Sequence, residues 1–323
     1  MTDDRRVTDD RPEPGDRPVS DDRPLIDVVD PGMLTLVEDL GRPGYASIGV
    51  GRSGAADRGA LRLGNRLVGN AATAAGLEVV LGGLELVFRR TGAVALTGAA
   101  GPAWVEDPDG TTVDVPMRAA VRVPAGAVLR LGPATRGLRR YVAVRGGVDV
   151  PVVLGSRSSD LLTGLGPAAL AAGDALPVGT LVDGLPELDP APDRAAPHVV
   201  GEPLVLAVLP GPRADWFVPA AWSVLTGRTY VVTPSSNRTA LRLDGATLDR
   251  AVPGELASEG LVAGALQVPP DGRPVLFLAD HPVTGGYPVL AVVTSRGLDE
   301  AAQLRPGDTV RFTSAERHAR HAG

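Results

Sequence analysis

A strand, a tight turn and a second strand recur along the chain, and this pattern restricts the fold more than any other feature of the sequence. In each copy an apolar run ends at Pro, Ala, Gly or Asp residues, and a second apolar run follows. Turns of this composition join neighbouring antiparallel strands. Repeated hairpins therefore predict a mainly β fold built from barrel-like sheets. The copies are VRVPAGAVLRLG (121–132), LAAGDALPVG (170–179), LQVPPDGRPVLFLAD (266–280) and LRPGDTVRF (304–312).

The composition favours the same fold class. Aromatic residues make up only 3% of the 323 residues, while Gly (41) and Pro (30) are abundant. The core must then consist mainly of Val, Leu and Ala on short strands between many turns. A chain of this length suits two modest domains or one large β-rich one. We expect two β-barrel-like domains with a few short capping helices.

Two segments have helical periodicity. Residues 57–68 place Leu61 and Leu67 on one face and begin at Asp57. The second helix is expected after Pro219, a residue suited to the first turn of a helix, and ends at Gly227. We expect both helices to cover the openings of barrels.

The two ends and one internal segment lack the apolar residues of a folded core. Residues 1–24 contain the triplet DDR three times and are expected to be a disordered tail, because they have almost nothing to bury. Residues 182–203 are rich in Pro and acidic residues, as in a linker. A boundary near Ala196 then predicts an N-terminal β-barrel-like domain at 25–196, a C-terminal domain at 197–315 and a second tail at 316–323.

Two absences exclude several chemistries. The chain has no cysteine, so it has no disulfide framework, thiolate nucleophile or Cys-ligated metal. It has no lysine either, and this excludes a Walker A loop, a Schiff base and a biotinylation site. The net charge of −6 provides no footprint for nucleic acid. Neither a signal peptide nor a membrane span is recognisable, so we expect a cytoplasmic protein without a membrane or nucleic-acid partner.

Eight segments, in order from about residue 26 to residue 312, together resemble the family of the 5-oxoprolinase C subunit. This family is also called biotin-dependent carboxyltransferase-like or allophanate hydrolase subunit 2, and it is related to urea amidolyase. The segments are LTLVEDLGRPGY (34–45), GVGRSGAADRGALRLGNRLVGN (49–70), LEVVLGG (77–83), ALTGA (95–99), YVAVRGGVDVPVVLGSRSSDLLTGLG (141–166), LPGPRADWF (209–217), ALQVPPDGRPVLFLAD (265–280) and TGGYP (284–288).

The resemblance implies a fold, a reaction and partners. It implies β domains of the cyclophilin-like barrel type and ATP-dependent opening of 5-oxo-L-proline to L-glutamate, together with the B and A subunits of 5-oxoprolinase. ATP would be a cosubstrate, with Mg²⁺ as its counter-ion and not as a protein-bound metal. Two alternatives stay open: a carboxyltransferase of the urea carboxylase type, served by carboxybiotin in trans, and a non-catalytic regulator of a sensor-kinase inhibitor.

The segment from Asp280 to Pro288 holds the densest set of chemically useful residues. Asp280, Thr284 and Tyr287 supply a carboxylate and two hydroxyls, and we predict them as catalytic residues. Gly285 and Gly286 would let the backbone approach a ligand and direct N–H groups at an anion. From the residues alone, a tight loop between strands is the simpler interpretation. The resemblance favours a ligand-binding loop.

Further polar residues are predicted to bind substrate or nucleotide. Gln267 lies in an apolar strand and would hydrogen-bond an amide, unless it faces outward as an ordinary strand residue. The other candidates are Arg238, Asn237, Ser258 and Glu259. Arg238 is preferred over Arg42 and Arg157 because hydroxyl and amide groups surround it.

The sequence does not assign a single role to each of the remaining motifs. Glu259 could also activate water. Residues 53–57 would cap the first helix or join the site, and capping is the simpler interpretation. His281 stands where relatives carry arginine, which leaves its role open. The histidines form no cluster, so no bound metal is expected.

Overall fold

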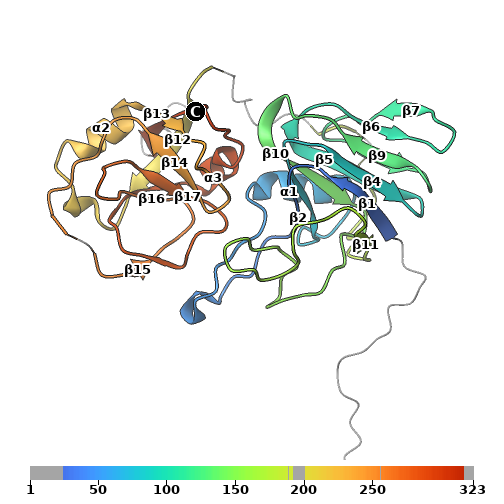
Figure 1. Ribbon diagram of the computed structural model, residues 1–323, viewed down its shortest axis with the longest axis horizontal. Helices are drawn as coiled ribbons and strands as arrows, with labels where there is room; N and C mark the ends of the chain where they lie inside the picture. The colour runs from blue at the N-terminus through green and yellow to red at the C-terminus, as the bar shows by residue number, and fades with distance from the viewer. Residues whose placement is uncertain (1–24, 188, 192–200, 255, 316–323) are drawn as a thin grey trace, which may run out of the picture.

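The computed structural model describes residues 25–187, 189–191, 201–254 and 256–315. They form two β-rich halves side by side (Figure 1), an N-terminal half whose described residues end at 191 and a C-terminal half whose described residues begin at 201. The predicted mainly β fold is confirmed. The predicted tails and the boundary near Ala196 lie outside the described residues, and the proposed domain limits stay predictions.

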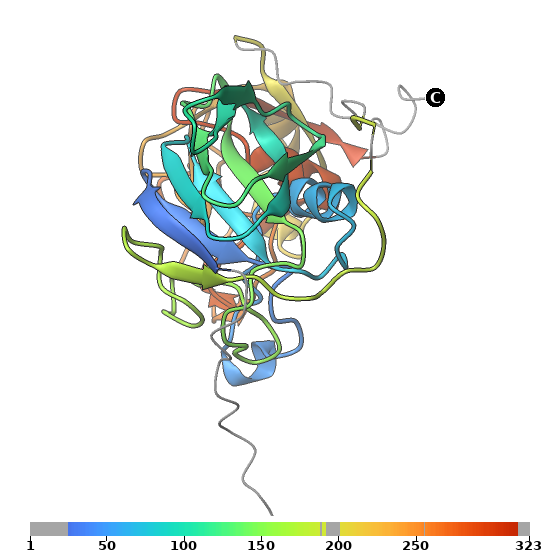
Figure 2. The same cartoon turned by 90° about the vertical axis from the view of Figure 1, so that its right-hand side faces the viewer.

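The N-terminal half consists of two antiparallel sheets around one core (Figure 2). Ile26 of one sheet and Leu77 of the other belong to a single buried cluster. The two layers pack through this cluster, so this half is a sandwich of two sheets. The first sheet has the order β11-β1-β4-β9-β6-β7, with β1 (Leu25–Pro31), β4 (Leu84–Phe88), β6 (Ala103–Glu106), β7 (Thr112–Asp114), β9 (Val128–Leu131) and β11 (Ala175–Pro177). The second has the order β2-β3-β10-β5-β8, with β2 (Thr35–Glu38), β3 (Gly76–Val80), β5 (Gly92–Ala100), β8 (Ala120–Val123) and β10 (Arg136–Val144).

One of the predicted hairpins connects the two layers instead. The segment 121–132 contains β8 and β9, but β8 pairs with β5, whereas β9 pairs with β4 and β6. The hairpin prediction is wrong here, because the turn at Gly126, with φ of 80°, carries the chain from one sheet to the other. A local turn pattern does not specify which strand becomes the partner.

The C-terminal half is a closed barrel of seven strands in the order β12-β19-β16-β17-β14-β13-β20. The barrel is closed because β12 and β20, at the two ends of this order, pair with each other. These two strands are parallel, and the other neighbours are antiparallel. The hairpin predicted at 266–280 is confirmed by the antiparallel pair of β16 and β17. The strands are β12 (Leu204–Pro210), β13 (Thr229–Val232), β14 (Ala240–Asp244), β16 (Ala265–Gln267), β17 (Val275–Phe277), β19 (Val289–Val293) and β20 (Thr309–Ser314), and a separate pair is formed by β15 (Glu259–Gly260) and β18 (Thr284–Gly285).

Both predicted helices are present. α1 (Arg58–Leu67) begins after Asp57, whose side chain accepts a hydrogen bond from the Ala60 N–H at 2.8 Å. A Cβ at Gly64 would lie 3.0 Å from the Ala143 side chain, so this glycine lets α1 pack closely on β10. α1 therefore covers the five-stranded sheet and does not close a barrel. α2 (Ala221–Gly227) packs its buried side chains into the core of the barrel.

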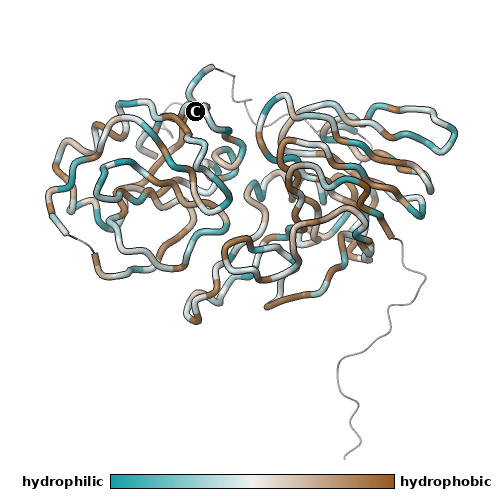
Figure 3. The backbone as a smooth tube through the Cα atoms, viewed as in Figure 1, coloured by the Kyte–Doolittle hydropathy of each residue, from teal (hydrophilic) through white to brown (hydrophobic). Residues whose placement is uncertain are grey.

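A third helix, α3 (Ser295–Ala301), was not predicted from the sequence. It lies next to α1 between the two halves (Figure 1). Two 3₁₀ turns, η1 (Ala46–Ile48) and η2 (Ala214–Trp216), complete the elements. Each half has its own apolar core, visible as apolar strands in Figure 3. No helix in the described part of the chain is long and apolar enough to cross a bilayer.

Candidate functional site

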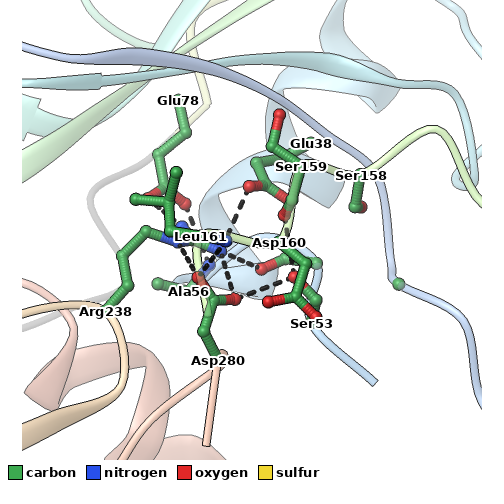
Figure 4. Close-up of polar contacts among 12 residues, drawn as sticks. Glu38, Ser53, Ala56, Glu78, Ser158, Ser159, Asp160, Leu161, Arg238 and Asp280 are labelled. Atoms are coloured by element: carbon green, nitrogen blue, oxygen red, sulfur yellow. Dashed lines mark hydrogen bonds and ion pairs between the residues drawn. The ribbon is translucent and has the colours of Figure 1, made fainter. Parts of the chain in front are cut away.

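Four charged side chains from both halves meet at their junction (Figure 4). Glu38 ends β2 and Glu78 lies in β3, while Arg238 precedes β14 and Asp280 follows β17. All four are buried, with at most 3% of any residue exposed. Charged residues are almost never buried to this extent without partners. We call these four residues the junction cluster.

Arg238 joins the two halves through its guanidinium. Within the C-terminal half its Nε donates to Asp280 Oδ2 at 2.8 Å. Across the junction Nη2 donates to the Gly54 carbonyl at 2.8 Å, and Nη1 donates to Glu78 Oε1. Nη2 also lies 3.1 Å from Glu38 Oε1. The guanidinium is engaged by protein groups, so a ligand would have to displace one of them to bind Arg238.

The pKa values of the two glutamates in the junction cluster are shifted in opposite directions. Burial raises the pKa of Glu38 well above its ordinary value, and Arg238 offsets this only in part. Burial also acts on Glu78, but Arg238 and Arg139 outweigh it and lower the pKa of that carboxyl. Arg238 and Arg139 thus provide the counter-charges that a buried Glu78 requires in low-dielectric surroundings.

Ser53 connects the junction cluster to a loop of the N-terminal half. Its Oγ lies 2.8 Å from Asp280 Oδ1 and 2.8 Å from the Ser159 carbonyl. Its φ of 51° is uncommon for a residue other than glycine, and such strain collects at functional sites. The capping interpretation of residues 53–57 is confirmed for Asp57. Ser53 adds a contact to the predicted catalytic residue Asp280.

The other predicted site residues form a second group on the C-terminal half. β18 contains Thr284 and Gly285 and pairs with β15, which places Gly285 opposite Glu259. Gln267 is buried, and its Nε2 donates to the Tyr287 carbonyl at 2.8 Å. Gln267 thus faces inward and fixes the backbone of the loop, and its amide is not presented to solvent.

Glu259 and Asn237 have local partners. Arg213 Nε donates to Glu259 Oε2 at 2.9 Å, and this hydrogen bond lowers the pKa of Glu259, opposite to what a water-activating base requires. Asn237 Oδ1 accepts from the Thr239 and Ala240 N–H groups at 2.9 and 3.2 Å, which makes it a turn residue. Ser258 is exposed.

The two glycines of the loop differ in the space around them. A Cβ on Gly285 would lie 2.6 Å from Leu261 Cδ1 and 2.7 Å from Gln267 Nε2, whereas a Cβ on Gly286 would meet only the Leu256 carbonyl, at 3.4 Å. Neither glycine is among the residues with positive φ. Gly285 is therefore required for packing within the loop.

His281 is buried beside the junction. Its Nδ1 lies 2.8 Å from the Pro282 carbonyl, and burial lowers the pKa of the ring. No group of three or more possible metal ligands occurs among the residues that the structure describes.

A crevice of about 210 Å³ lies between the halves, next to the junction cluster. One wall belongs to the N-terminal half and contains Arg52, Arg58 and Arg62. The other wall belongs to the C-terminal half and is mainly apolar around Ala279, with one carboxylate, Asp299. The complete lining is Arg52, Ala55, Ala56, Arg58, Arg62, Ala263, Leu278, Ala279, Ser295, Leu298 and Asp299.

Sequence reasoning missed Glu38, Glu78 and the three crevice arginines. The two glutamates had a recognisable signal, because each interrupts an apolar strand, in LTLVED and LEVVLGG. Such a residue is either exposed or paired in the core. The arginines had no such signal, since in a chain with 32 of them their meeting with α3 depends on how the halves pack.

Comparison with known proteins agrees with this architecture. Residues 48–314 match the family described as carboxyltransferase domain, subdomain A and B. The chain is 36% identical to the C subunit of 5-oxoprolinase from Escherichia coli (strain K12), over 89% of this chain and 90% of that protein. It is 31% identical to the urea amidolyase of Saccharomyces cerevisiae, over 89% of this chain but 16% of that one.

A solved structure gives the same result at the level of the fold. The crystal structure of the Kluyveromyces lactis urea amidolyase matches with a TM-score of 0.83 and 30% identity, over 90% of this chain. The chain spans only 19% of the length of that protein, whereas it spans nearly all of the bacterial 5-oxoprolinase chain. The predicted family resemblance is confirmed, and the chain belongs to the carboxyltransferase-domain (subdomain A and B) family that includes the 5-oxoprolinase C subunit.

Proposed function

We propose that this chain is the C subunit of a cytoplasmic, ATP-dependent 5-oxoprolinase that converts 5-oxo-L-proline to L-glutamate with the A and B subunits. The observation that carries the proposal is the 36% identity to the C subunit of a bacterial 5-oxoprolinase, which extends over nearly the full length of both chains. The urea amidolyases, by contrast, match this chain over only a small share of their own length.

The reaction requires an inert amide to become electrophilic. ATP, with Mg²⁺ as its counter-ion, would phosphorylate the lactam oxygen, after which water attacks the same carbon and the ring C–N bond breaks. The ring nitrogen takes a proton and becomes the amine of glutamate, and the carbon is left as an acyl phosphate, which a second water hydrolyses to the carboxylate and free phosphate. Positioned donors near the developing charge would account for much of the acceleration.

The junction is where we place the substrate. Pockets for drug-sized ligands usually exceed about 300 Å³. The crevice, at about 210 Å³, suits a molecule as small as 5-oxoproline and not a whole nucleotide. Its arginines fit an anion, so the residues present suit the carboxylate of this substrate. We place ATP outside the crevice, at the contact with a partner subunit. Asp280, Thr284 and Tyr287 remain the proposed catalytic residues.

Carboxyl transfer from carboxybiotin to a urea-like amide is the second candidate function. The match to urea amidolyase, with its TM-score of 0.83, favours it. Urea is neutral, however, and provides no partner for three arginines around one crevice. A substrate with its own carboxylate could pair with these arginines.

Reconstitution distinguishes the two functions. The chain should show little 5-oxoproline-dependent ATP hydrolysis alone, and mixing it with the A and B subunits should produce glutamate in proportion to the ATP consumed. The matched control is the mixture of those two subunits without this chain. If the full set yields no glutamate, while a biotin carrier supports carboxylation of urea, the second function replaces the first.

A further inference from the structure

We propose that the arginine wall of the crevice binds the carboxylate of the substrate, and that the apolar wall packs against the ring of a small cyclic amide. The inference rests on the proposed function, because it assigns a site to that substrate. It also predicts a specificity: cyclic amides without a carboxylate should bind poorly.

The positive charge of the crevice exceeds what the protein itself neutralises. Three arginines line it against one carboxylate, Asp299. Burial, followed by the neighbouring Arg52, lowers the pKa of Arg58, and Asp299 counteracts this only in part. The charged form of an arginine that lies near other arginines is stabilised when an anion enters the crevice.

The guanidinium of Arg58 has no hydrogen bond or ion pair with any residue that the structure describes. Its backbone N–H donates to Asp299 Oδ1 at 3.0 Å, which fixes the start of α1 against α3. The carboxylate of Asp299 therefore hydrogen-bonds the backbone of Arg58 and acts on its guanidinium only through charge. This contrasts with Arg238, whose guanidinium is saturated by protein groups. Arg58 is partly buried and keeps its forked donors for a ligand.

The opposite wall restricts the rest of the ligand. Ala263, Leu278 and Leu298 present apolar groups, and Ser295 contributes a hydroxyl. A volume of about 210 Å³ accommodates a five-membered ring with its carboxylate, and a second cavity of about 1270 Å³ adjoins it at Arg62 and Asp299. A carboxylated lactam matches these features: its carboxylate would meet the arginines, its ring would meet the apolar wall, and its amide would lie within reach of the Ser295 hydroxyl.

Steady-state kinetics of the complex with the A and B subunits test the proposal. Arg58→Gln should raise the KM for 5-oxoproline by on the order of 10- to 100-fold, the loss of one charged hydrogen-bonded contact, while the KM for ATP stays unchanged. Arg296→Gln is the matched control, because it removes the same charge from a side chain of α3 that is 78% exposed. It should leave both constants unchanged.

Two further probes separate charge from shape. Ala263→Leu adds no charge but fills the crevice, and it should also raise the KM for 5-oxoproline. The lactam 2-pyrrolidinone has the ring without the carboxylate. Its inhibition constant should be at least about 10-fold higher than the dissociation constant of 5-oxoproline, and it should be the same in wild type and Arg58→Gln.

The outcomes distinguish the site from the function. If the complex produces glutamate but folded Arg58→Gln keeps the wild-type KM for 5-oxoproline, the site assignment is wrong and the function stands. A rise in the KM for ATP alone would identify the wall as a phosphate site and also overturn the assignment. If the complex produces no glutamate, the function fails. Calorimetry of 5-oxoproline with the full chain then decides: binding that Arg58→Gln abolishes supports the site, and absence of binding overturns it.

Discussion

Arginines occur in two places at the junction of the halves, and the two places differ in their counter-charges. In the junction cluster, Arg238 is 3% exposed and contacts three carboxyl groups and a carbonyl. In the crevice, Arg52, Arg58 and Arg62 share one carboxylate. The difference shows that the partners, and not the residue type, decide whether an arginine holds the fold together or remains available for a ligand.

The largest expected effect is on stability, from loss of the junction arginine. Arg238→Met keeps most of the side-chain volume but leaves Asp280 buried without the guanidinium that donates to it, and Glu78 with Arg139 alone. Breaking a buried ion pair from one side costs on the order of 3–5 kcal/mol. Urea denaturation should show this loss. A loss below about 1 kcal/mol would mean that the junction cluster does not hold the halves together.

Glu38→Gln is the matched control for that measurement. Burial raises the pKa of Glu38 well above its ordinary value, so an amide of the same shape should change the free energy of unfolding by less than about 1 kcal/mol. A loss as large as that of Arg238→Met would show that Glu38 is ionised.

The second prediction concerns Asp57, the residue that caps α1 at the junction of the halves. Burial, followed by Asp299, raises the pKa of Asp57 from 3.8 to about 7, and Gln303 of the C-terminal half donates to its Oδ2 at 2.7 Å. The folded protein therefore keeps a proton that the unfolded chain releases between these two pH values. The contribution of this proton to stability is complete below about pH 4 and is lost as the pH rises to about 7.

Asp57→Asn tests this dependence and keeps a side chain that can cap α1. Wild type should lose stability relative to the variant as the pH rises from about 4 to about 7, with an upper limit of about 4 kcal/mol, since one pKa unit corresponds to about 1.4 kcal/mol. Denaturation curves at several pH values in this range provide the measurement. Parallel pH profiles would contradict the raised pKa.

A smaller effect is expected in the Thr284–Tyr287 loop. Gly285→Ala places a methyl group against Leu261 and the Gln267 amide and should cost about 1–3 kcal/mol, as overpacking does. Gly286→Ala should stay within about 0.5 kcal/mol, because its new methyl meets only one carbonyl at ordinary contact distance. Thermal denaturation of both variants compares them directly. Equal losses would refute the packing role of Gly285.

The sequence predicted the parts of this structure that depend on local chemistry. The helix after Asp57, the helix after Pro219 and the hairpin at 266–280 follow from capping, proline and turn residues that act on their neighbours. The third helix has seven residues, too few for a clear periodicity, and unlike the equally short α2 it does not closely follow a proline.

Long-range pairing explains what the sequence did not predict. The turn at 121–132 carries the chain between two sheets, and no local pattern states which strand will be its partner. Arg238 and Asp280 were both predicted as site residues, and they bond to each other within the C-terminal half, but the bond from Arg238 to Glu78 arises only when the halves meet. The crevice arginines likewise form a site only when the halves pack together, because α3 provides the wall opposite them.

The central claim is that the arginines of the junction cluster and of the crevice have separate tasks, and one paired measurement tests it. The free energy of unfolding and the KM for 5-oxoproline are measured for Arg238→Met and Arg58→Gln in the complex with the A and B subunits. We predict that Arg58→Gln raises the KM by on the order of 10- to 100-fold with little change in stability, whereas Arg238→Met lowers stability by on the order of 3–5 kcal/mol. A variant pair in which Arg58→Gln destabilises the fold as much as Arg238→Met, and leaves the KM unchanged, would contradict the account.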